Sequence, residues 1–176
     1  RSLHGGDIFD PSKKESPHKH WYYRLAGKVL ISLADVVIAQ SRNTLENAQK
    51  FYKTGKNIKI IPLPYNVYSY KSASREELGL DEGKKYVIGV GRLVARKNFH
   101  AFVRAINELD DSACGLIIGE GPEKKSLEKL IRELKIEGRV KLLGFLSEEK
   151  KFQYLENADV YLLSSSHEGL GIVLQE

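Results

Sequence analysis

The sequence predicts an α/β protein built on parallel sheets. Short apolar runs, typical of buried strands, alternate along the chain with amphipathic segments of about ten residues or more, which are typical of helices. This alternation favours parallel strands joined by right-handed crossover helices. With 176 residues, of which 41% are hydrophobic and 29% charged, the chain can build a core and hold one domain or two small ones.

The first elements lead to a candidate domain boundary. The apolar run at 36–39 predicts a short strand, and Ser41 is a candidate N-cap for a helix at 42–53. A second strand is predicted at 57–61 and runs into the Pro-rich stretch 62–66. Because a polar segment follows that stretch, we place the boundary between two domains there.

The remainder of the chain predicts a larger parallel sheet. Its strands end in glycine-bearing turns, and each turn leads into a helical pattern. Pro122 suits a first helical turn, and Ser147 is a candidate N-cap. We expect strands at 86–90, 115–119, 140–143 and 160–164, and helices at 98–109, 122–135 and 148–157.

Composition excludes several classes of protein. No apolar run approaches the roughly 18 residues that span a bilayer, and the polar N-terminal region does not have the pattern of a signal peptide. The single cysteine, Cys114, lies in an apolar strand and indicates a core residue in a reducing compartment, while the five histidines lack the spacing of a metal site. The net charge of +5 suits an anionic substrate, an anionic membrane surface or nucleic acid, and does not choose among them.

The most informative motif is formed by the last ten residues, which follow the strand at 160–164. Gly169 and Gly171 allow a sharp turn before a helix, an arrangement that presents backbone N–H groups to an anion. Glu168 and Glu176 bracket this turn, and their carboxylates can accept hydrogen bonds from sugar hydroxyls. The motif therefore predicts a nucleotide-sugar site. In the alternative interpretation, Glu168 is a solvated loop residue, and Glu176 lies near a helix N-terminus, where the helix dipole favours a carboxylate.

A second motif follows the strand at 86–90. Arg92 comes directly after Gly91 at the carboxyl end of the strand, and Lys97 is predicted at the start of the next helix. Open α/β sheets bind ligands at this edge. A planar guanidinium together with an ammonium group suits a diphosphate. The alternative is a pair of solvated surface cations.

Two further turns lie between these motifs. Gly119 and Gly121 follow the strand at 115–119, and Gly144 and Phe145 follow the strand at 140–143. By residue type alone, these glycines suit ordinary turns.

Together these motifs resemble those of the retaining GT-B glycosyltransferases of group 1 (family 4). The family sequence Ser-x-x-Glu-Gly-Phe-Gly and the Glu-x7-Glu signature match the chain from Ser164 to Glu176, with Leu170 in place of Phe. The family sequence Val-Gly-Arg-Leu-x-x-x-Lys-Gly matches residues 90–97, with Asn98 in place of Gly. Relatives of the family's Gly-x-Gly-Pro and Val-x-Phe-Leu-Gly turns stand at 119–122 and 140–144.

The resemblance implies a role for each residue. Arg92 and Lys97 would clamp the donor diphosphate. Glu168 would contact the transferred sugar and Glu176 the ribose. The turns would approach the nucleotide, which gives as substrate-binding residues Gly91, Gly119, Gly121, Gly144, Phe145, Gly169, Leu170, Gly171 and Glu176.

The N-terminal region also resembles the family. Ser2 to Asp7 is similar to its Val-Thr-Leu-His-Gly-x-Asp, so His4 would lie near the acceptor and the transferred sugar; the alternative is a solvated histidine. The implied fold is a GT-B architecture of Rossmann-like parallel sheets with an incomplete N-terminal domain. Residues 1–66 would be the C-terminal part of the acceptor-binding domain with the linker, and 67–176 a truncated nucleotide-sugar-binding domain.

The segment 13–28 mixes basic and aromatic side chains. It could rest on anionic lipid head groups as a peripheral membrane contact. In the plainer interpretation, which we prefer, it belongs to a helix whose Trp21, Leu25 and Val29 pack inward at four-residue spacing. Single-stranded nucleic acid is a third option, but the domain pattern carries no RNA-binding signature, so we expect no nucleic-acid partner.

The predicted function is transfer of a sugar, with retention of configuration, from a UDP-, GDP- or ADP-linked donor to a glycan or lipid-linked acceptor. The alternatives are a GT-B nucleotide-sugar epimerase and a non-enzymatic nucleotide- or phosphate-binding Rossmann-like module. The resemblance implies no metal and no cofactor, consistent with the lack of an Asp-x-Asp motif. We expect the protein in the cytoplasm, with the inner face of the membrane as a second option, and expect the isolated 176-residue chain to be inactive.

Overall fold

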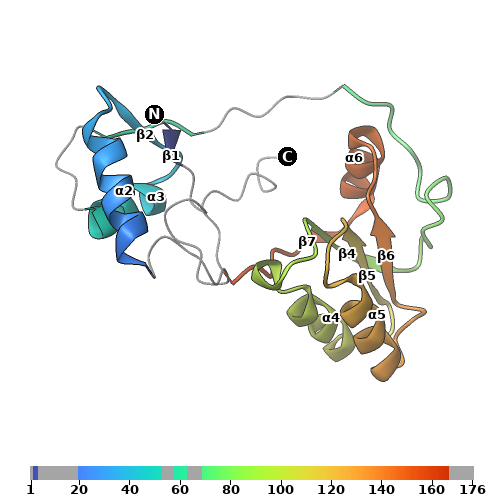
Figure 1. Cartoon of the computed structure of the whole chain (residues 1–176). Coiled ribbons are helices and arrows are strands. Elements are labelled where there is room, and N and C mark those ends of the chain that lie inside the picture. Colours follow the sequence, from blue (N-terminus) through green and yellow to red (C-terminus); the bar gives the residue numbers. More distant parts are fainter. Residues whose placement is uncertain (1, 4–19, 53–57, 63–68, 167–176) are drawn as a thin grey trace. The chain divides into compact units, whose positions relative to one another are not determined.

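The computed structural model describes residues 2–3, 20–52, 58–62 and 69–166. The chain divides into two compact units, of which the second spans Val67–Ser166. Each unit has its own parallel sheet with helices packed on it (Figure 1). The α/β class predicted from the alternating pattern is confirmed. The assignment of the units to acceptor and donor binding stays a prediction.

The first unit contains a small sheet and two helices. Ser41 caps the second helix as predicted, since its Oγ accepts a hydrogen bond from the Thr44 amide at 3.1 Å. Ile31, Val37, Ala48 and Tyr52 form the core between helices and sheet. The strands are β1 (Ser2–Leu3), β2 (Val37–Ala39) and β3 (Ile58–Ile60), in the order β1-β2-β3, and the helices are α2 (Trp21–Ser32) and α3 (Arg42–Tyr52).

Helix α2 does not bury the side chains that its sequence spacing suggests. Trp21, Leu25 and Val29 are 74%, 54% and 49% exposed, so the prediction that they pack inward is wrong. The helix instead approaches α3 at Gly27, where an added Cβ would lie 2.3 Å from Cε1 of Tyr52, and buries Ile31 one turn later. Positions two residues from Gly27 are rotated by about 200° around a helix. The stripe therefore faces away from α3.

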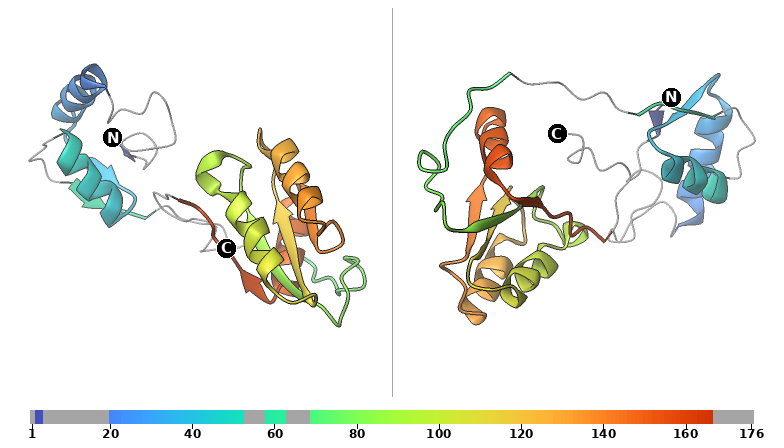
Figure 2. Two further views of the ribbon diagram at one scale, coloured as in Figure 1. Left: turned by 90° about the horizontal axis from the view of Figure 1, so that it is seen from below. Right: turned by 180° about the vertical axis from the view of Figure 1, so that it is seen from behind.

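The second unit is a four-stranded parallel sheet in the order β6-β5-β4-β7, covered on both faces (Figure 2). Helices α4 and α5 cover one face and α6 the other. The α6 start is the predicted one, since Ser147 Oγ accepts a hydrogen bond from the Lys150 amide. The strands are β4 (Lys85–Val90), β5 (Ala113–Ile118), β6 (Val140–Gly144) and β7 (Val160–Tyr161), and the helices α4 (Phe99–Glu108), α5 (Lys124–Glu133) and α6 (Glu148–Asn157).

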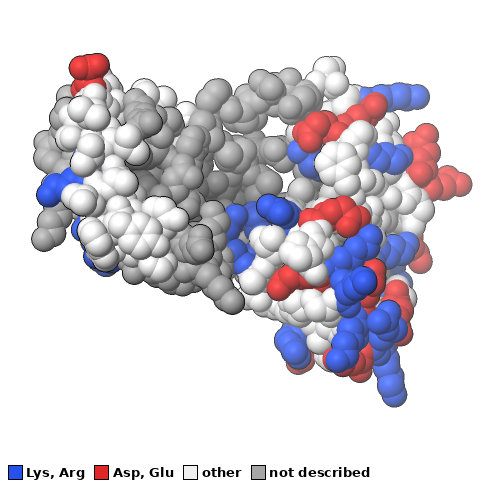
Figure 3. Space-filling view, viewed as in Figure 1, with Lys and Arg blue, Asp and Glu red and all other residues white. Residues whose placement is uncertain are grey.

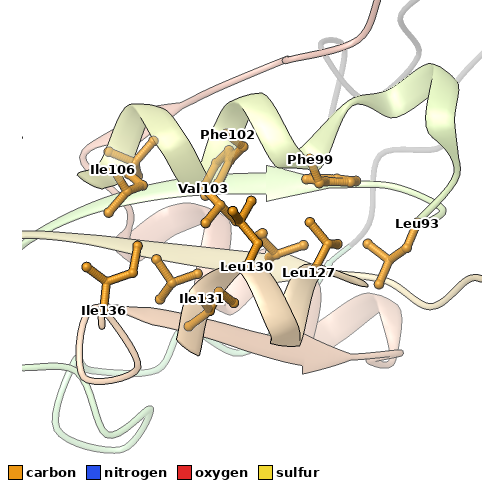
Figure 4. Packing of buried hydrophobic residues seen from close by; sticks show 12 residues of the cluster. Leu93, Phe99, Phe102, Val103, Ile106, Leu127, Leu130, Ile131 and Ile136 are labelled. Atoms are coloured by element: carbon orange, nitrogen blue, oxygen red, sulfur yellow. The ribbon is translucent and has the colours of Figure 1, made fainter. Parts of the chain in front are cut away.

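Alternate strand residues supply two hydrophobic cores. On one face, Phe102 and Ile106 of α4 and Leu127 of α5 belong to one cluster over the sheet (Figure 4). On the other face, Ile88 and Leu116 pack against Leu78, Leu80 and α6. Cys114 is buried in this second cluster, as its apolar neighbours predicted. These two layers hold the strands rigidly and fix where their carboxyl ends lie.

Several predicted boundaries differ from the structure by one or more residues, and three of these differences have a local cause. Helix α4 begins at Phe99 because Asn98 adopts a left-handed conformation, with φ 50°. Helix α5 begins at Lys124, since the Glu123 amide donates to the Leu93 carbonyl of a neighbouring turn. Strand β7 has two residues where five were predicted. The Leu162 amide still donates to the Ile88 carbonyl of β4, but the residues after Leu162 bond to the loop that follows β4.

The amino ends of the strands are tied together by one carboxylate. Asp159 accepts hydrogen bonds from the Tyr86 amide at 2.8 Å and from Arg75 at 3.0 Å, and it pairs with Lys85 at 3.2 Å. The hydrogen bond from the Tyr86 amide, together with the positive charges of Lys85 and Arg75, lowers the pKa of Asp159. This connection joins β7, β4 and the turn at 75–79 on the edge opposite the candidate site.

Candidate functional site

The candidate site lies at the carboxyl edge of the second sheet. Since all four strands are parallel, the loops after β4, β5, β6 and β7 leave from this edge. Figure 3 shows that on one face of the second unit basic side chains are mixed with acidic ones, densely around α5. Surface charge alone therefore does not mark the site, and the main-chain geometry of the loops is more informative.

The loop after β4 carries both predicted cations. Arg92 is exposed and follows Gly91, while Lys97 is half-buried. An added Cβ on Gly91 would lie 3.1 Å from Lys97 Cε and 3.5 Å from its Nζ. The ammonium group therefore lies over the residue next to Arg92, so the two cations share one turn at the end of the strand.

The sequence suggested that Lys97 lies at the start of the helix, but the structure places it before the helix. It ends a short 3₁₀ turn, η2 (Ala95–Lys97), and Asn98 separates that turn from α4. Asn98 has φ 50° and ψ 44°, a left-handed conformation that asparagine tolerates better than most residues. This explains why a residue other than Gly can stand at the position where the family motif has Gly.

Gly119 and Gly121 let the loop after β5 pack directly on the loop after β4. A Cβ on Gly119 would lie 2.0 Å from the Gly91 carbonyl oxygen, and one on Gly121 would lie 2.3 Å from the Leu93 carbonyl oxygen. The Leu93 amide donates to the Glu120 carbonyl at 2.9 Å. These glycines therefore shape the loop that holds Arg92 through main-chain contact, and contact with a nucleotide stays a prediction.

Gly144 and Phe145 continue the edge after β6. The Gly144 carbonyl accepts a hydrogen bond from the Gly119 amide at 2.8 Å, and an added Cβ would lie 2.9 Å from Oε1 of Glu120. That carboxylate pairs with Lys124 at 3.0 Å. Phe145 is 83% exposed and belongs to neither core, so its ring has no packing role in this unit and can meet a ligand.

The serine turn after β7 contacts the loop that carries Lys97. Ser164 Oγ donates to the Lys97 carbonyl at 2.8 Å. The amide of Ser166 donates to the Arg96 carbonyl at 2.9 Å, and its hydroxyl at 3.1 Å. The structure thus brings the described residues that precede the C-terminal motif against the loop of the first motif. Sequence reasoning matched Ser164 to the family motif but gave it no role.

Several predicted site residues lie outside the described residues, and their roles stay predictions. They are His4, Glu168, Gly169, Leu170, Gly171 and Glu176. Segment 13–28 is described only from residue 20.

Within residues 2–3, 20–52, 58–62 and 69–166, no group of three or more His, Cys, Asp or Glu side chains could hold a metal ion. In the same part of the chain, no helix has both the length and the apolar character to cross a bilayer.

Comparison with known proteins gives consistent matches. Residues 71–176 match the family described as glycosyl transferases group 1. The chain is 31% identical over 163 residues to an N-acetylgalactosamine-N,N'-diacetylbacillosaminyl-diphospho-undecaprenol 4-alpha-N-acetylgalactosaminyltransferase of Campylobacter jejuni, covering 90% of this chain and 44% of that protein. It is 29% identical over 157 residues to an N-acetyl-alpha-D-glucosaminyl L-malate synthase of Bacillus anthracis, covering 83% of this chain and 39% of the relative. The chain thus spans less than half the length of these relatives.

Solved structures agree on the fold. The Anabaena protein HepE in complex with UDP and glucose superposes with a TM-score of 0.78 at 24% identity, over 98% of this chain and 48% of that protein. Sucrose-phosphate synthase from Thermosynechococcus elongatus superposes with a TM-score of 0.81 at 22% identity, over 98% and 45%. These matches confirm the predicted α/β fold, with GT-B glycosyltransferases as structural neighbours.

Proposed function

The chain belongs to the glycosyl transferases group 1 family, and from that premise we propose that it contributes the donor site of an enzyme that moves a sugar from a nucleoside-diphosphate sugar to an acceptor. The observation that carries this proposal is the placement of Arg92 and Lys97 on one turn at the carboxyl end of β4. Main-chain packing against the loop after β5 builds that turn.

The two cations suit the charge that develops in the reaction. When the bond between sugar and nucleoside diphosphate breaks, negative charge grows on the leaving phosphate. A well-placed fixed donor lowers such a barrier by about 3 kcal/mol. Arg92 supplies a planar fork for phosphate oxygens and Lys97 a compact charge.

The remaining roles follow the family resemblance. We propose that the reaction retains anomeric configuration, as in family 4. Glu168 would orient the transferred sugar without attacking it, Glu176 would hold the ribose, and His4 would lie near the acceptor. The transferase names of the relatives do not favour the epimerase or the non-enzymatic alternative.

The substrates are proposed from the neighbours. Among UDP, GDP and ADP we favour UDP, because the HepE structure contains it. A lipid-linked glycan is the favoured acceptor, since the Campylobacter relative is named for a diphospho-undecaprenol substrate. A glycan acceptor without a lipid remains the second option.

A peripheral membrane contact through residues 13–28 is part of this proposal. Trp21 and Tyr22 are exposed on α2, close in sequence to Arg24 and Lys28. Exposed aromatic and basic side chains suit a bilayer interface with anionic lipids. We therefore place the protein in the cytoplasm, at the inner face of the membrane.

We also propose that transfer needs no metal ion and no cofactor, since Arg92 and Lys97 can neutralise the diphosphate themselves. Chelation of divalent cations with EDTA should therefore leave binding of a nucleoside diphosphate by this chain within about twofold. A loss that Mg²⁺ or Mn²⁺ restores would contradict this part of the proposal.

The proposal is tested by removing one cation. Arg92→Ala should weaken binding of UDP about ten- to hundredfold, because a hydrogen bond to a charged group contributes about 1.5–3 kcal/mol. Thermal stability without ligand should not change, since Arg92 is exposed. The matched control is Arg104→Ala, which removes an exposed arginine of α4 and should have no effect on UDP binding. Equal affinities for the wild type and Arg92→Ala would refute the diphosphate site.

A further inference from the structure

We infer that Ser164 and Ser166 are positioning residues that set the place of Lys97 by holding the main chain of η2. The inference rests on the proposed function of Lys97 as part of a diphosphate site. It gives a role to the serine turn after β7. This turn contacts the loop that carries Arg92 and Lys97, but it has no charged side chain of its own.

The contacts are concentrated on the last two carbonyl groups of η2. Ser164 Oγ donates to the Lys97 carbonyl at 2.8 Å, over 67 positions of sequence. The Arg96 carbonyl accepts from both the amide and the hydroxyl of Ser166, at 2.9 and 3.1 Å. Carbonyl groups at the end of a short helical turn lack partners within that turn. The serines supply those partners from the segment that follows the neighbouring strand β7.

Lys97 is therefore held from two directions. Its carbonyl is bonded to Ser164, and its side chain lies against Gly91, with Cε 3.1 Å from the place of a Cβ. The serine turn is itself anchored to β4, since the Leu162 amide donates to the Ile88 carbonyl at 2.8 Å. A shift of η2 would move the ammonium group relative to Arg92, and misplacement of a binding group by about 1 Å can cost about a hundredfold in rate.

The same serines come shortly before the proposed sugar-binding motif in the sequence. Glu168, the residue proposed to orient the sugar, comes two positions after Ser166 in the sequence. The hydroxyl groups act through the peptide backbone and do not need to touch substrate.

The test is a double-mutant cycle between Ser164 and Lys97, read by calorimetric titration of the 176-residue chain with UDP, GDP and ADP in turn. Ser164→Ala should weaken the tightest of these ligands about three- to tenfold, the usual effect of one lost hydrogen bond. Lys97→Met should weaken it at least tenfold. In the Lys97→Met background, Ser164→Ala should add less than about twofold, because the group it positions is gone.

Three companion variants separate positioning from general stability. Ser164→Thr retains a hydroxyl and should keep most of the affinity. Ser126→Ala removes a hydroxyl that donates to the Glu123 carbonyl at the same 2.8 Å, and it should leave binding unchanged. Ser166→Ala keeps the amide bond to Arg96, so it should fold even if Ser164→Ala does not, and should show a smaller loss of the same kind.

The outcomes distinguish this inference from the proposed function. If Lys97→Met weakens binding and Ser164→Ala adds its full effect in that background, the serine does not act through Lys97 and the inference is overturned while the diphosphate site stands. If Lys97→Met binds as the wild type does, or if none of the three nucleotides binds, both are overturned.

Discussion

At the residue scale, glycines decide whether the site can form. Gly119 has φ 141° and lies so close to the loop after β4 that a Cβ would be 2.0 Å from the Gly91 carbonyl oxygen. Gly119→Ala should therefore destabilise the second unit by at least about 2 kcal/mol, as expected where steric overlap and an unfavourable φ combine. Urea unfolding measures this loss. Gly138→Ala, with no atom within 4 Å of the added Cβ, should be nearly neutral, and equal losses in the two variants would argue against a special role for Gly119.

The residues also show what the sequence could and could not predict. Arg92 and Lys97 were found from residue type and from their place after a strand, because strand ends are local features. The left-handed Asn98 and the serine contacts were not found. Asn98 has many allowed conformations in isolation, and the bond from Ser164 to Lys97 joins residues 67 positions apart. Such contacts depend on the order of strands in the sheet, and no local sequence pattern predicts that order.

At the element scale, the alternation of apolar runs and amphipathic segments predicted the helices and strands of the second unit well, because its strands are buried on both faces and its helices on one. It failed for α2, where spacing alone suggested an inward stripe of Trp21, Leu25 and Val29. Gly27, a residue without a side chain, sets which face of α2 approaches α3. Hydrophobic periodicity is read from apolar side chains, so it cannot predict a close helix contact that forms because Gly27 has no side chain.

Strand β7 is short, and we expect its attachment to depend on Asp159. Asp159→Asn should lower the free energy of unfolding of the second unit by about 1–3 kcal/mol at neutral pH, because three donors lose a charged acceptor. Since folding lowers the pKa of this carboxyl, its stabilisation is present above the unfolded pKa of about 4 and is lost as the pH falls through the folded value. Urea midpoints measured from pH 7 to 2 should therefore show the gap between wild type and variant closing below about pH 4. A gap that stays constant with pH would contradict this account.

At the scale of the whole molecule, the chain carries the proposed donor site but spans less than half of its relatives. Catalysis needs donor and acceptor groups held together to within about an ångström. We therefore expect the 176-residue chain to bind a nucleoside diphosphate weakly and to transfer no sugar. A radiolabelled donor assay with water and with lipid-linked acceptors measures this, and transfer by the chain alone would mean that the active site is more local than two GT-B domains require.

The central claim, that the loops after β4 and β5 bind a nucleoside diphosphate, is tested most directly by mapping the amides that respond to ligand. Heteronuclear NMR spectra of the 176-residue chain are recorded while UDP, and in separate titrations GDP and ADP, is added to saturation. The account predicts that the largest shifts fall on Gly91, Arg92, Lys97, Gly119 and Gly121, with residues at the opposite edge, such as Ser112 and Asp159, unchanged. Saturable binding whose shifts lie at that opposite edge, or leave Gly91 and Lys97 unmoved, would contradict it.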